Sequence, residues 1–110
     1  MSKAAKFEVL KRIAFGSVSS SYASIGAVTS NPWRKFTITN NTDVPVIVTT
    51  DSGESAGKWF LPKTSYITED VSTNENGDYI ELPAKTQFSV KDDGSAATSG
   101  DVVIQGGLYI

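Results

Sequence analysis

NPWRKFTITNNTDVPVIVTT, residues 31–50, is the stretch that decides the fold class. Phe36 and Ile38 alternate with threonines, and this period of two is typical of a β-strand with one buried face. The polar residues 40–45 then predict a turn, because Asn and Asp tolerate left-handed backbone conformations. A second β-branched run follows, with Pro45 at a strand start or edge. The stretch therefore predicts two consecutive strands, at 34–40 and 45–50.

The same pattern continues on both sides of this stretch. Tyr22 and Ile25 are expected to anchor a long connection before it, and Asn76-Gly77 is a strong hairpin signal after it. Further strands are expected at 13–16, 58–62, 64–71, 78–83, 85–92 and 102–110, the last with a bulge at Gly106-Gly107. About eight short antiparallel strands predict an all-β fold, a single-domain, jelly-roll-like β-sandwich with an extended N-terminal arm.

The composition of the 110-residue chain excludes several kinds of chemistry. It has no Cys and no His, which removes disulfides, thiol chemistry, the usual general base and the commonest transition-metal ligand. A length of 110 residues suits one domain. No apolar run is long enough for a signal segment or a membrane span, so we expect a soluble chain without membrane contact.

Charge is distributed unevenly along the sequence. Four basic residues and one acidic residue give the first twelve residues a charge of +3, which leaves −5 for the rest of a chain whose net charge is −2. We therefore divide the chain into a basic arm, residues 1–12, and a sandwich domain, residues 13–110. Such an arm can reach the acidic body of another copy. Aromatic residues are not interleaved with the basic ones, and this disfavours nucleic acid as the partner.

No motif in the sequence carries catalysis or metal binding convincingly. Glu69 and Glu81 on neighbouring strands could form a glycosidase pair, but no other feature singles them out. Residues 70–81 place oxygen ligands at calcium-loop positions, but Glu75 stands where the loop requires Gly. We expect no catalytic residues, no metal site, no cofactor and no small-molecule ligand, and we do not expect an enzyme.

Aromatic residues beside basic ones are the best candidates for an interface. Trp59 and Phe60 are adjacent, so if they lie in a strand one of them must face outward, where it can anchor a partner. The residues that we assign to a partner or oligomer interface are Lys3, Lys6, Phe7, Lys11, Arg12, Trp33, Arg34, Trp59 and Phe60.

Several short motifs, in order, resemble those of small virion proteins of tailed bacteriophages, of the neck, connector or decoration type. They are Ile13-Ala14-Phe15-Gly16-Ser17, Ser21-Tyr22-Ala23, Ile25-Gly26, Asn31-Pro32-Trp33-Arg34, Ile38-Thr39-Asn40-Asn41-Thr42-Asp43, Asp51-Ser52-Gly53, Leu61-Pro62, Asp70-Val71-Ser72, Ser99-Gly100-Asp101-Val102 and Tyr109. The resemblance implies a non-enzymatic β-sandwich that forms a symmetric homo-oligomer at the head–tail neck or tail. Its partners would be its own copies and portal, tail or capsid proteins.

Two alternatives stay open beside this hypothesis. One is a capsid decoration protein, which shares the implied location in the virion after synthesis in the host bacterial cytoplasm. The other is a sugar- or calcium-binding sandwich module, in which Trp33 or Trp59 would stack on a sugar ring.

Overall fold

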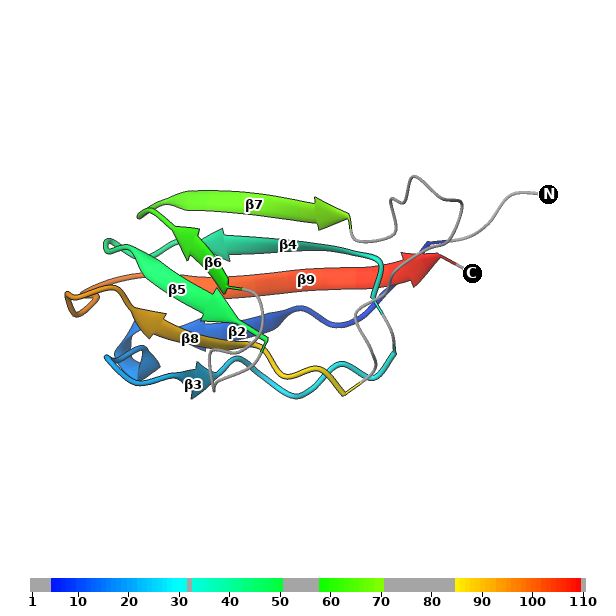
Figure 1. The fold of residues 1–110 in the computed structure, drawn as a ribbon, viewed down its shortest axis with the longest axis horizontal. Helices are drawn as coiled ribbons and strands as arrows, with labels where there is room; N and C mark the ends of the chain where they lie inside the picture. The colour runs from blue at the N-terminus through cyan, green and yellow to red at the C-terminus, as the bar shows by residue number, and fades with distance from the viewer. Residues whose placement is uncertain (1–4, 32, 51–57, 71–84, 110) are drawn as a thin grey trace.

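The chain folds as a sandwich of two antiparallel β-sheets (Figure 1). The structure is a computed structural model that describes residues 5–31, 33–50, 58–70 and 85–109. Its strands are β1 (Ala5–Phe7), β2 (Lys11–Ala14), β3 (Ala23–Ser24), β4 (Lys35–Asn40), β5 (Val46–Thr49), β6 (Lys58–Leu61), β7 (Ser65–Asp70), β8 (Ser89–Asp92) and β9 (Asp101–Tyr109). The first sheet has the order β1-β9-β4-β7, with β2 also paired to β9, and the second has the order β3-β8-β5-β6. The predicted all-β sandwich is confirmed.

Strands β4 and β5 lie in different sheets. In β4, Phe36 and Ile38 are buried while Lys35 is exposed, so the predicted alternation is confirmed. In β5 all four residues are buried. β5 is flanked by β6 and β8, and Ile47 on its outer face lies opposite Phe60 and Lys91, which limits its contact with water.

An aromatic cluster fills one end of the core. Trp33, Phe36 and Phe88 are each at most 1% exposed. The Trp33 ring centroid lies 5.7 Å from that of Phe88 and 6.4 Å from that of Phe36. Phe36 and Phe88 meet edge to face at 5.6 Å, the arrangement that aromatic quadrupoles favour. Burial of the predicted anchor Ile25 is also complete.

Strand β9 runs without interruption through Gly106-Gly107, so the predicted bulge there is wrong. Its register with β4 is continuous from Asn40↔Val102 to Lys35↔Gly107. The glycine serves packing instead, because a Cβ on Gly106 would lie 2.4 Å from Cε3 of Trp33 and 2.8 Å from Cβ of Phe36. Glycine at position 106 therefore makes room for the indole.

The irregularity in this sheet lies in the N-terminal segment, between the two strands that pair with β9. Phe7 pairs with Gly107 and Lys11 pairs with Ile104, so three residues of the N-terminal segment, 8–10, face only Gln105 and Gly106. The predicted boundary between an arm and the domain at residue 12 falls inside β2. Residues 5–7 are extended and form part of the first sheet.

Other expected strands begin or end at different residues, or lie outside the described residues. The strand expected at 13–16 lies two residues earlier, as β2 at Lys11–Ala14, because Phe15 begins a 3₁₀ turn, Phe15–Ser17. The strand expected at 85–92 begins only at Ser89, although Phe88 and Val90 are buried as predicted. The Asn76-Gly77 hairpin, the strand at 78–83, Glu81 and most of the calcium-like loop lie outside the described residues.

Candidate interaction surface

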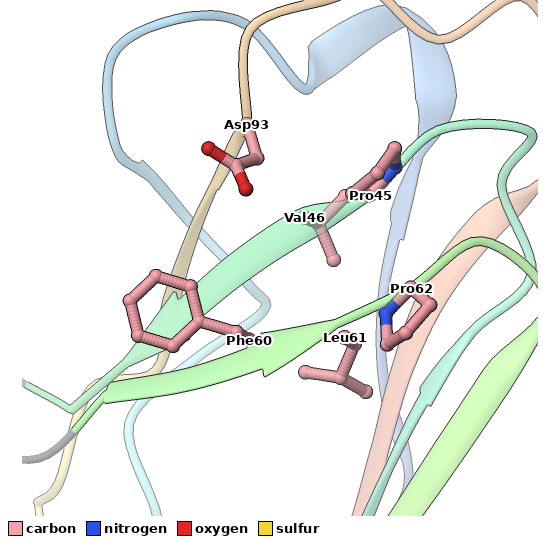
Figure 2. A pocket seen from close by; sticks show the side chains of 6 residues that line it. All are labelled: Pro45, Val46, Phe60, Leu61, Pro62 and Asp93. Carbon is pink, nitrogen blue, oxygen red and sulfur yellow. The ribbon is translucent and has the colours of Figure 1, made fainter.

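An open apolar hollow of about 210 Å³ lies at the end of the second sheet where β5 begins and β6 ends (Figure 2). Its lining residues, which we call the Phe60 hollow, are Pro45, Val46, Phe60, Leu61, Pro62 and Asp93. Val46 lies opposite Leu61 in the β5–β6 pair, and both are 1% exposed. The backbone N–H of Asp93 donates to the Pro45 carbonyl at 3.1 Å, and this bond holds the loop after β8 beside the start of β5.

A buried amide holds the two proline rings of the hollow in position. Asn40, at the end of β4, is fully buried. Its Nδ2 donates to the carbonyl of Val44, just before Pro45, at 2.9 Å, and to the carbonyl of Pro62 at 3.0 Å. Its Oδ1 accepts a hydrogen bond from the Thr42 hydroxyl at 2.6 Å. Because a buried polar group is costly to leave unpaired, this network fixes the two segments that carry Pro45 and Pro62.

Phe60 is the exposed member of the aromatic pair. Phe60 is 64% exposed. Trp59 is half-buried, and its ring meets that of Phe36 edge to face with 5.5 Å between the ring centroids. The prediction that the two side chains point to opposite faces is confirmed. Figure 2 shows the Phe60 ring extending away from Leu61, across the hollow from Pro62. An aromatic ring that is open to solvent beside two prolines is the kind of feature that anchors protein interfaces.

Trp33 does not belong to the surface, and its assignment to an interface is wrong. The residue is 0% exposed and packs under β9 at Gly106. A sugar ring cannot stack on an indole in this position, and Trp59 already packs on Phe36. The hypothesis of a sugar-binding module therefore loses Trp33 as a stacking platform, whereas Trp59 is half-buried.

The basic residues of the predicted interface whose side chains are described, Lys11, Arg12 and Arg34, do not line the hollow. Lys11 is only 7% exposed, because its Nζ lies 5.7 Å from the centre of the Trp33 ring and 3.4 Å from the Val28 carbonyl. Arg12 is exposed and its Nε pairs with Asp101 Oδ2 at 2.6 Å. Arg34 is half-buried and its backbone N–H donates to Gly107. Lys3 lies outside the described residues, and for Lys6 and Phe7 only the backbone is described.

Glu8 fixes the N-terminal segment to the loop before β4. Its carboxylate accepts hydrogen bonds from the backbone N–H groups of Ser30, at 3.0 Å, and Asn31, at 2.8 Å. Partial burial raises the pKa of Glu8, but these bonds together with contributions from the side chains of Trp33 and Asn31 outweigh it and hold the pKa below its usual value. The Trp33 N–H helps to lower the pKa of Glu8, although it makes no hydrogen bond of ordinary geometry.

The other carboxylate with a shifted pKa also serves as a structural acceptor. Asp43 accepts from the hydroxyl and the backbone N–H of Thr98, and these bonds lower the pKa of Asp43. They connect the turn after β4 to the loop before β9. Within the described parts of the chain, no three His, Cys, Asp or Glu side chains converge on a possible metal position. Nor does any helix there have the length and apolarity of a membrane span.

Comparison with known proteins gives a fold relationship only. No protein-family model matches the chain, and no curated protein matches it. One solved structure is similar, a chain described with the words "Bacillus endospore appendages form a novel family of disulfide-linked pili". The TM-score is 0.53 at 15% sequence identity, over 98% of this chain and 92% of that chain. The two proteins share a fold.

Proposed function

We propose that this protein is a non-catalytic structural subunit that associates with its own copies through the Phe60 hollow. The observation that carries the proposal is the exposure of Phe60, at 64%, on an apolar surface that Asn40 holds in a fixed shape. Interfaces draw most of their binding energy from a few such anchors, and a fixed shape reduces the entropy lost on association. The lowered pKa values of Glu8 and Asp43 suit hydrogen-bonded anchors rather than a general acid at neutral pH.

The similar structure supports an assembling role, because that protein is described as forming pili. Its assembly is also described as disulfide-linked, and this chain has no cysteine. Copies of this chain would therefore hold together without disulfide bonds. Reducing agent would leave such an assembly intact.

The kind of particle is a finer part of the proposal. The motif resemblance favours a tailed-phage virion, at the neck or tail, or as a capsid decoration protein. The fold relationship favours an extracellular appendage. A closed ring suits a neck, whereas an open filament suits an appendage, and both can be built from the same sandwich.

Sedimentation velocity of the purified protein over a hundredfold concentration range, followed by electron microscopy, tests the proposal. We expect species much heavier than the 11.7 kDa chain, unchanged by a reducing agent, and either rings or filaments in the images. A protein that stays monomeric throughout that range would contradict the proposed function.

A further inference from the structure

We propose that β1 exchanges between copies, so that in the assembly the β1 strand of one chain pairs with β9 of its neighbour. This inference rests on the proposed self-association and names a second contact between copies, in addition to the Phe60 hollow. In the single chain, β1 pairs with the last residues of β9 in the register Ala5↔Tyr109, Lys6↔Leu108 and Phe7↔Gly107. The pairing of β4 with β9 ends at Lys35↔Gly107. In the described chain, residues 108 and 109 thus have only β1 as a strand partner.

A short apolar hinge separates β1 from the rest of the sheet. Val9 is 88% exposed and Leu10 is 48% exposed, although both sit between two strands that pair with β9. They occupy the place where the register shifts by one residue. Two adjacent apolar residues this open to water are unusual beside a strand pair and are typical of a surface that a partner covers. The hinge therefore marks where the N-terminal segment can separate from its own sheet.

The residues on either side of the hinge are held very differently. On the C-terminal side, β2 makes four residue pairs with β9, and the Lys11 side chain is buried against Trp33. On the N-terminal side, the segment depends on three residue pairs, the Glu8 N–H donating to the Gly106 carbonyl at 3.1 Å, and the Glu8 carboxylate bonds. The N-terminal set consists of these few pairs and hydrogen bonds at the end of the sheet, so we expect β1 to open while the sandwich stays folded.

Exchange costs little because a neighbouring copy offers the same contacts. The ladder of β9 and the Ser30 and Asn31 N–H groups are identical in every copy, and exchange of an identical element is a low-cost route to association. The six residues 5–10 that precede β2 span roughly 20–22 Å when extended, so β1 can reach a sandwich that lies directly beside its own. The exchanging residues 1–8 hold Lys3, Lys6 and Glu8, a net charge of +1 against −3 on the rest of the chain, which attracts the segment toward another copy.

Engineered cysteines in this cysteine-free chain test the exchange directly. Lys6 and Leu108 are directly opposite, and opposed residues in antiparallel strands have Cα atoms within the range that a disulfide needs. Differently tagged Lys6→Cys and Leu108→Cys chains are unfolded, mixed, refolded together and oxidised. We expect a covalent heterodimer of about twice 11.7 kDa on a non-reducing gel.

A mixture of Lys6→Cys with Thr68→Cys is the matched control, because Thr68 is exposed on β7 at the opposite edge of the same sheet. The heterodimer should exceed this control by on the order of tenfold, since paired strands give a high effective concentration. The double variant Lys6→Cys/Leu108→Cys should give a ladder of covalent multimers. Two results together would overturn the exchange. The double variant would give only an internally closed monomer or no disulfide, and the Lys6→Cys and Leu108→Cys mixture would give no more heterodimer than the control.

The outcome separates this inference from the proposed function. Heavy particles by sedimentation without the 6–108 crosslink between chains would mean association through the Phe60 hollow alone. A strictly monomeric protein would overturn both. The crosslink between chains together with heavy particles supports both.

Discussion

Trp33 and Phe60 are two aromatic residues with similar sequence contexts and opposite places in the fold. Trp33 precedes Arg34 and Phe60 lies two positions after Lys58, and each is next to or within an expected strand. Trp33 is fully buried, whereas Phe60 is 64% exposed. The difference comes from what lies opposite each ring. Trp33 meets Gly106, which has no side chain to displace it, while Phe60 lies on the outer face of β6. One ring stabilises the fold, and the other is available to a partner.

The largest expected effect comes from removing the Trp33 ring, and removal of the Phe60 ring is the comparison. Trp33→Ala should lower the free energy of unfolding by about 3–5 kcal/mol, because it leaves a cavity in the aromatic cluster. Phe60→Ser should change it by less than about 0.5 kcal/mol, as is usual for surface substitutions. Urea unfolding of both variants measures the contrast, and Trp33→Phe supplies an intermediate case if Trp33→Ala does not fold. Equal losses for Trp33→Ala and Phe60→Ser would remove the distinction.

The close approach of β9 to the indole predicts the next effect. Gly106→Ala should destabilise the protein by about 1–3 kcal/mol, because the new Cβ would overlap the Trp33 ring. Gly16→Ala is the control, since a Cβ there has nothing within 4 Å. Thermal unfolding compares the two variants. A Gly106→Ala protein as stable as Gly16→Ala would show that the indole does not need this space.

Glu8 gives a smaller effect that depends on pH. Its pKa is lowered in the folded state, so its stabilisation is complete above the unfolded pKa of about 4.3 and is lost as pH falls through the folded value. Glu8→Gln should therefore cost about 1 kcal/mol at pH 7, since the hydrogen bonds are charge-assisted but partly solvated, and less near pH 2.5, where more of the Glu8 carboxylate is protonated. Urea unfolding at the two pH values tests this. Glu69→Gln controls for loss of a negative charge elsewhere, and an equal deficit for Glu8→Gln at both pH values would contradict the account.

Local pattern predicted the strands well, because alternation is a property of neighbouring residues. Phe36 and Ile38 face inward, and Phe60 and Trp59 face opposite ways, as a period of two requires. Where the sequence interpretation was wrong, the decisive contact came from a distant segment. Gly106 indicated a bulge when considered alone, but its role is to accommodate Trp33.

The candidate site could be predicted only in part for the same reason. Lys11 belongs to a basic run, yet it is buried because Val28 and Trp33 receive its side chain. Pro45 and Pro62 indicated only turns and strand ends. Their meeting in the Phe60 hollow depends on the Asn40 amide, which bonds to carbonyls from both segments. Nothing in the pattern around residue 40 shows which carbonyls its side chain will reach.

The most direct measurement of the central claim is sedimentation velocity of the wild type beside Phe60→Ser and Tyr66→Ser. Tyr66 is the matched control, because it is an aromatic residue, 71% exposed, that lies opposite Thr39 in the first sheet and outside the hollow. The account predicts that Phe60→Ser weakens self-association at least about tenfold, as loss of an interface anchor does, while Tyr66→Ser associates like the wild type. Wild-type assembly by the Phe60→Ser protein would contradict it.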